Sequence, residues 1–102
     1  WDVSNVKNMI SMFACDSKFN QDISRWNVSK VEHMRRMFDG CKSFNQDLSK
    51  WDVSNVEDMD DMFYGCKKFN SDLSSWNVSK VYTKENMFTD CPCPKERQPK
   101  FK

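Results

Sequence analysis

The chain has 102 residues and a formal net charge of +1, with 16 Lys and Arg against 15 Asp and Glu. This length allows one domain with a modest core. Charges of both signs are mixed along the chain, which indicates a solvated surface and argues against nucleic-acid binding. We find no apolar run of membrane-spanning length and no signal peptide, so we expect no transmembrane segment.

The sequence repeats itself with a 25-residue period: WDVSNV stands at 1–6 and 51–56, and WNVSKV at 26–31 and 76–81. When the chain is aligned on this period, the four Trp share one column and the seven Met share two. A fixed period of this kind is typical of repeat proteins, whose units bury their apolar edges on one another. We expect about 3.6 repeats over 1–91, followed by a Pro-rich, basic tail at 92–102. The repeats are 1–25, 26–50, 51–75 and 76–91.

A short helix is predicted in the middle of each repeat. Val31, Met34, Met37, Phe38 and Cys41 follow the spacing of one helix face. The predicted helix starts at a capping box and ends at a glycine that suits a left-handed C-terminal residue. The capping residues are Ser29 with Glu32 and Ser54 with Glu57, and the glycines are Gly40 and Gly65.

A short strand is predicted over 48–54, where Trp51 and Val53 alternate with polar residues. Between helix and strand lies a turn-rich link at 44–47. One short strand and one short helix per 25-residue coil predict an α/β repeat fold, a right-handed leucine-rich-repeat-like solenoid.

The motifs resemble a known family. Ile23-x-x-Trp26-x-Val28-x-x-Val31 is similar to the leucine-rich-repeat phrase, with Trp and Val in leucine places. The pattern MFxGCxxFNxDLSxWxVSxV, with Met-Phe-x-x-Cys at 37–41 and 62–66, resembles the BspA-like repeats of mycoplasma-type surface lipoproteins. This family is a domain family of unknown function. The resemblance covers 1–91, and it implies a secreted or cell-surface protein that binds a protein or cell-surface ligand in adhesion.

Candidate binding residues lie beside the Trp column. The residue after each Trp is expected to point outward from the strand, on an exposed sheet face, because side chains alternate along a strand. We expect this face to bind the ligand, although its mixture of charges specifies no particular one. The candidate residues are Arg25, Asn27, Lys50, Asp52 and Asn77.

A second polar column consists of Asp22, Asp47 and Asp72, two residues after Asn20, Asn45 and Asn70. One interpretation is that these side chains bind backbone N–H groups in the turn. The alternative is a Ca²⁺ site, since Ca²⁺ favours clustered oxygens. No other cofactor is expected.

Asn27-Val-Ser29 and Asn77-Val-Ser79 match the N-glycosylation pattern. Glycosylation of Asn27 and Asn77 would require a eukaryotic secretory cell. The other interpretation is that this position requires only a short polar residue, because Asp takes the same place in the other repeats.

The chain has five cysteines. Cys41, Cys66 and Cys91 share a column, and we expect them to pack as small apolar side chains. The odd count leaves room for one or two disulfides, with Cys15, Cys91 and Cys93 the least constrained. A zinc site is disfavoured, because Cys91-Pro-Cys93 lacks the spacing of a zinc knuckle.

The sequence carries no phosphate-binding loop, nucleophile elbow or metalloprotease helix, and its one His, His33, is expected to face solvent. We therefore expect a protein without enzymatic activity, a binding module for protein ligands or adhesion. The alternative is a structural protein that assembles end to end. The complete apolar motif that begins at Trp1 leaves an edge that preceding repeats, a partner or another copy must cover. The Pro-rich segment at 91–94 argues against that alternative.

Overall fold

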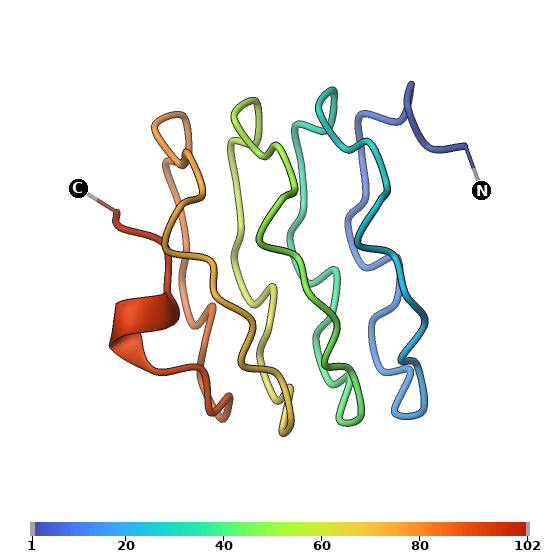
Figure 1. Cartoon of the computed structure of the whole chain (residues 1–102), viewed down its shortest axis with the longest axis vertical. Coiled ribbons are helices and arrows are strands. Elements are labelled where there is room, and N and C mark those ends of the chain that lie inside the picture. The colour runs from blue at the N-terminus through green and yellow to red at the C-terminus, as the bar shows by residue number, and fades with distance from the viewer. Residues whose placement is uncertain (1, 102) are drawn as a thin grey trace.

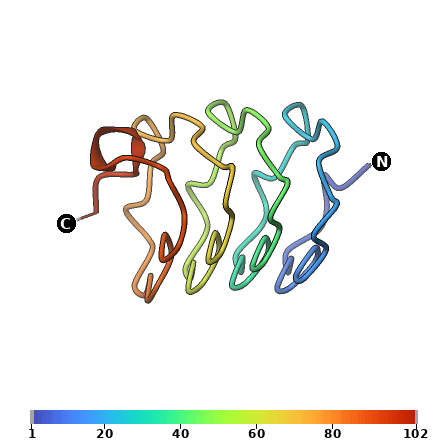
Figure 2. The same cartoon turned by 90° about the horizontal axis from the view of Figure 1, so that it is seen from below.

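The computed structural model describes residues 2–101 and measures 32 × 28 × 20 Å along its principal axes. The chain runs in four successive turns that lie side by side, with its two ends at opposite sides of the molecule (Figure 1). The same order is visible after a rotation of 90° (Figure 2). We call each turn a layer; layers one to four begin at residues 1, 26, 51 and 76.

The layers contain almost no regular secondary structure. Across residues 2–101 the only helix is the 3₁₀ helix η1, Lys95–Arg97. Strand pairing in this described range is limited to isolated parallel bridges that join Asn8 to His33, His33 to Asp58 and Asp58 to Thr83. The predicted α/β repeat fold, a right-handed leucine-rich-repeat-like solenoid with one short strand and one short helix per coil, is therefore wrong.

The predicted helix fails because its N–H groups bond to the next layer. A helix would direct each N–H to the carbonyl four positions earlier in the same segment. The N–H groups of alternate residues in 31–41 instead reach carbonyls one layer onward. Left-handed backbone at Arg36 (φ 57°) and Gly40 (φ 77°) also interrupts a helix. The bonds concerned run from Arg36 to Asp60 (2.8 Å), from Phe38 to Met62 (2.9 Å) and from Gly40 to Tyr64 (2.7 Å).

The predicted strand over 48–54 is replaced by turns. Asp52 Oδ1 accepts hydrogen bonds from the Ser54 N–H at 3.0 Å and from its hydroxyl at 2.6 Å. The Trp51 N–H donates to the carbonyl of Leu48 within the same turn of sequence, at 3.1 Å. Since these groups bond locally, they form no ladder with a neighbouring strand.

Backbone hydrogen bonds hold neighbouring layers together along one edge. At alternate residues, the N–H of residue i donates to the carbonyl of residue i + 24, as from Phe13 to Met37 (3.0 Å). In the opposite direction, the N–H groups of Glu32, Glu57 and Tyr82 donate back to the layer before, and the His33 N–H shares the acceptor of Glu32. The same pattern recurs between layers one and two, two and three, and three and four. We call this set of bonds the seam.

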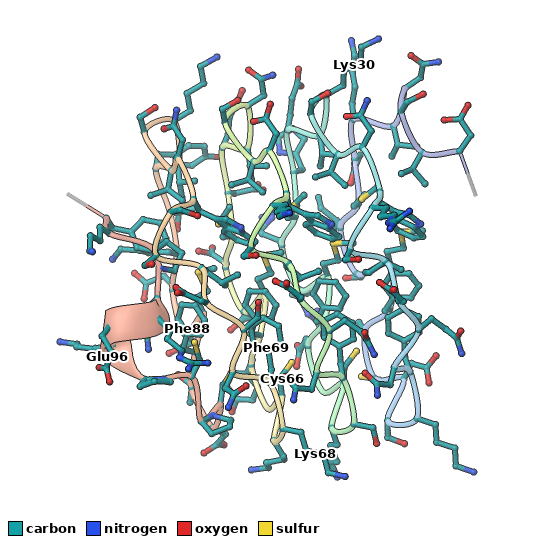
Figure 3. All side chains as sticks on the ribbon, in the orientation of Figure 1. Lys30, Cys66, Lys68, Phe69, Phe88 and Glu96 are labelled. Atoms are coloured by element: carbon teal, nitrogen blue, oxygen red, sulfur yellow. The ribbon has the colours of Figure 1, made fainter. Side chains whose placement is uncertain are left out.

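The core is built from identical residues stacked layer on layer. The rings of Phe38 and Phe44 stack at 4.3 Å within layer two, and Phe38 lies 5.5 Å from Phe63 in layer three. Buried Trp51 donates its Nε1–H to the carbonyl of Ile23 at 3.0 Å. Trp1, the first member of the Trp column, lies outside the described residues. Figure 3 shows Phe69 and Cys66 in this interior, with Lys30 and Lys68 at opposite tips of their layers.

The cysteines within residues 2–101 are free thiols. Cys41 and Cys66 are buried, as expected for small apolar side chains, and their Sγ–H groups donate to the carbonyls of Phe13 and Phe38, both at 3.0 Å. Burial raises the pKa of Cys41 to about 12 and also raises the pKa of Cys66.

The C-terminal segment packs against layer three. The N–H of Leu73 donates to the Arg97 carbonyl at 2.7 Å, and the Arg97 guanidinium donates to the Asn70 carbonyl at 3.0 Å. Cys93 and Pro99 are buried, and Lys84 Nζ lies 5.1 Å from the centre of the Phe101 ring. The division of the chain at residue 91 stays a prediction.

Candidate functional site

The seam edge carries side chains that differ between layers. Positions 3, 6, 12 and 13 of the repeat hold the same residue in all four layers, whereas positions 7, 8, 10 and 11 change in character. Position 10, for example, is Ile10, Arg35, Asp60 and Glu85 in turn. We call these four positions the variable face. Its residues are Lys7, Asn8, Ile10, Ser11, Glu32, His33, Arg35, Arg36, Glu57, Asp58, Asp60, Asp61, Tyr82, Thr83, Glu85 and Asn86.

A buried carboxylate organises the centre of the variable face. Asp58 is 2% exposed, and its Oδ2 lies 3.2 Å from His33 Nδ1 and 3.3 Å from Arg35 Nε. Its Oδ1 accepts the Met34 N–H at 3.2 Å. Layer three thereby fixes two side chains of layer two, so His33 is held by a carboxylate instead of facing solvent freely.

A second carboxylate orders the next two layers. Asp60 Oδ1 accepts a hydrogen bond from the Thr83 hydroxyl and another from the Glu85 N–H, both at 2.7 Å. Burial, together with the charges of Asp39 and Asp60, raises the pKa of Asp61. The side chains of layers three and four on this face are therefore crowded with negative charge.

Charge changes sign across the variable face. Layer two contributes Arg35 and Arg36, and Arg36 Nε lies 3.2 Å from Asp39 Oδ2. Layers three and four contribute Asp60, Asp61 and Glu85. A face with a basic stripe beside an acidic one favours a partner with the opposite arrangement.

The predicted binding residues lie elsewhere on the molecule. Arg25, Asn27, Lys50, Asp52 and Asn77 are all exposed. They do not lie on a sheet, because their segments form turns: Asn27 and Asn77 accept the N–H groups of Ser29 and Ser79 at 3.0 and 3.1 Å. Their part in binding stays a prediction, as does glycosylation of Asn27 and Asn77.

Each predicted calcium ligand bonds to a serine two residues onward. Asp22, Asp47 and Asp72 accept the N–H groups of Ser24, Ser49 and Ser74 at 3.0, 2.9 and 3.0 Å. Serine hydroxyl and backbone hydrogen bonds lower the pKa of all three carboxyls. Within residues 2–101 no group of three or more His, Cys, Asp or Glu side chains gathers as a metal cluster. This geometry matches the turn interpretation, and calcium binding stays a prediction.

The sequence interpretation missed the variable face because it relied on columns that repeat. The informative signal was the opposite one: positions 7, 8, 10 and 11 vary while their neighbours at 9, 12 and 13 are mostly constant. A framework that is kept while certain exposed positions change is typical of a repeat surface that carries recognition.

The chain belongs to the family described as "Mycoplasma protein of unknown function, DUF285", which matches residues 1–101. Neither the curated proteins nor the solved structures contain a match. In the described part of the chain, no helix has the length and apolar character needed to cross a membrane.

Proposed function

We propose that this chain is a non-enzymatic module of a secreted or cell-surface protein, which binds a protein ligand in adhesion through the variable face. The observation that carries the proposal is that layer-specific charged side chains lie along the hydrogen-bonded seam. Arg35, Arg36 and Glu85 are exposed, and Asp60 and Asp61 are half-buried. A seam of backbone bonds holds these side chains at fixed spacing, which lowers the entropic cost of binding.

The chemistry of the face defines the partner. Arg35 and Arg36 suit carboxylates, since a guanidinium binds them with two parallel hydrogen bonds. Asp60, Asp61 and Glu85 suit Lys or Arg side chains. The ligand is therefore a protein surface with acidic residues beside basic ones. The resemblance of the Met-Phe-x-x-Cys motifs to BspA-like repeats favours adhesion as the setting.

The test compares two double variants. Each substitution introduces a residue that another repeat of the chain already has at the same position. Arg36→Ser with Asp61→Asn alters the variable face, and Lys50→Ser with Asp52→Asn alters the predicted face beside the Trp column. Both leave the net charge unchanged. Beads coated with each protein are applied to cultured animal cells, and the adhering beads are counted.

Loss of adhesion in the first variant alone supports the proposal. Loss in the second variant alone places binding beside the Trp column and contradicts it. Equal, background-level adhesion of the parent chain and both variants also contradicts it. Circular dichroism and thermal melting confirm that each variant is folded.

A further inference from the structure

Layers one and four, the outer layers of the described residues, present complementary halves of a seam. Within residues 2–101, no hydrogen bond engages the N–H groups of Lys84, Asn86, Phe88 and Asp90 in layer four. The carbonyls at the equivalent edge of layer one are also without donors there. These carbonyls belong to Asn8, Ile10, Met12 and Ala14.

The donors and acceptors are in register. Four repeats have a combined length of 100 residues, so in a continued stack residue n of a second copy corresponds to position n + 100. A seam bond joins the N–H of residue i to the carbonyl of residue i + 24, so Lys84 requires a carbonyl at place 108. Asn8 of a second copy corresponds to that position. By the same rule, the N–H groups of Asn86, Phe88 and Asp90 would donate to the second copy's carbonyls of Ile10, Met12 and Ala14. In the opposite direction, the second copy's Lys7 N–H would donate to the Tyr82 carbonyl.

A two-layer alternation also continues across this junction. Position 5 is Asn5, Lys30, Asn55 and Lys80 in turn. Lys30 Nζ bonds to Asn5 Oδ1 at 3.0 Å, and Lys80 Nζ bonds to Asn55 Oδ1 at 2.9 Å. Between these pairs, Asn55 Nδ2 donates to the Ser29 carbonyl at 2.7 Å. The second copy's Asn5 would meet the Ser79 carbonyl as Asn55 meets that of Ser29.

The layer-four end has space and apolar surface for the incoming layer. A groove of about 640 Å³ lies there, lined by Val78, Val81, Tyr82 and Phe101 among others. Tyr82 is 72% exposed, and at the other end of the stack Met12 is 38% exposed. Apolar surface left on both ends favours their contact.

We propose that layer four binds layer one of a second copy, head to tail, through an intermolecular seam. The occupant is a second copy because the contact continues an interface that the chain already makes three times. Such a contact does not close on itself, so it produces linear oligomers. Phe101 lines the groove and lies 25 residues after Trp76, where a further repeat would have its Trp. An incoming copy must therefore displace Phe101.

Sedimentation velocity over a wide concentration range tests the association. Tyr82→Lys places a cation beside the second copy's Lys7 and is expected to weaken association at least tenfold. Tyr64→Lys is the matched control, since Tyr64 is an exposed tyrosine of layer three. A parent chain that stays monomeric, or equal association of the two variants, overturns the proposal.

Cross-linking tests the register independently. A Cβ at Gly40 would lie 3.5 Å from Cys15 Cα in the layer before it, which is within disulfide reach. Asp90 and Cys15 of a second copy have the same relation, so oxidised Asp90→Cys is expected to form a ladder of dimers and trimers on a non-reducing gel. The ladder must vanish when Cys15→Ser is added. A ladder that persists, or none at all, contradicts the register.

The cross-linking experiment leaves the variable face unaltered, because Asp90 and Cys15 are not among its residues. A chain that oligomerises but does not adhere to cells contradicts the proposed function alone, and a monomer that adheres contradicts head-to-tail binding alone.

Discussion

Two columns of left-handed residues bend the chain in every layer. Ser11, Arg36, Asp61 and Asn86 have φ between 56° and 59°. The second column contains Gly40 and Gly65, at φ 77° and 72°. Glycine adopts this conformation without steric cost, whereas other residues do so at a penalty that is smaller for Asn and Asp.

Replacing Gly65 by alanine is expected to lower the free energy of unfolding by about 1 kcal/mol, because the Cβ disfavours left-handed backbone. The added Cβ would lie 3.7 Å from Gly40 Cα, an ordinary contact, so the conformation is the main cause. Urea denaturation measures the change. Gly65→Asn is the control and should cost less; equal losses for the two variants would refute this explanation.

Replacing Asp61 by asparagine is expected to stabilise the protein at pH 7 by roughly a few tenths of a kcal/mol, since Asp61 is only partly buried. Its folded pKa is raised, so its charge costs stability above the ordinary pKa of 3.8. The gain should shrink as the pH falls toward that value and vanish below it. Urea denaturation from pH 3 to pH 7 tests this, and a gain that is independent of pH would contradict it.

The seam explains why helix and strand were predicted and not formed. The apolar spacing over 31–41 fits a helix face, yet it also fits a chain that bends at Arg36 and Gly40 and bonds to the next layer. Sequence periodicity does not distinguish these cases, because both bury the same side chains. The strand prediction overlooked local chemistry: Asp47-Leu-Ser49 and Asp52-Val-Ser54 each close a turn through the Asp side chain.

Trp51 links two layers through its indole nitrogen. Trp51→Phe is expected to lower the free energy of unfolding by about 0.5–1.5 kcal/mol, because the buried Ile23 carbonyl loses one of its two donors and keeps only the Trp26 N–H. Trp76→Phe should behave similarly, since its indole bonds to the Leu48 carbonyl at 2.9 Å. Urea denaturation provides the values. Tyr82→Phe, at an exposed site, is the neutral control; a Trp51→Phe variant as stable as this control would contradict the role of the bond.

At the scale of the whole molecule, the repeat and the core were predictable from sequence. Columns of Val, Met, Phe and Trp were expected to pack together, and most of these residues are buried in the two middle layers. The path of the chain was not predictable, because it depends on bonds between groups in different layers that leave no local pattern. The variable face depends on the same bonds.

Thiol reactivity should follow position in the stack. Exposed Cys15 is expected to be alkylated first, then half-buried Cys91 and buried Cys93, and last Cys41 and Cys66 of the middle layers. Burial raises the pKa of Cys93 to about 11, so thiolate is scarce at neutral pH. Timed alkylation with mass spectrometry measures the order. Early labelling of Cys66 in the native protein would contradict it.

The same thiols predict loss of stability in alkali. A thiol whose folded pKa is raised stabilises the folded state below the unfolded pKa of 9.0, and this contribution is lost as the pH rises beyond that value. Thermal melting between pH 7 and pH 10 should show a decline that starts near pH 9. Cys66→Ala provides the control, because it removes a titrating group and should show a shallower decline. Equal declines for the parent chain and this variant would count against the thiol explanation.

The alternation of Asn and Lys at position 5 limits how such a chain can change length. Loss of the repeat that contains Lys30 would bring Asn5 and Asn55 into adjacent layers and remove the Lys30-to-Asn5 bond, whereas the Lys80-to-Asn55 bond would remain. Loss or gain of two repeats together preserves every pair. Gene duplication in this protein is thus expected to add or remove two repeats at a time, so that the duplicated unit is twice as long as one layer.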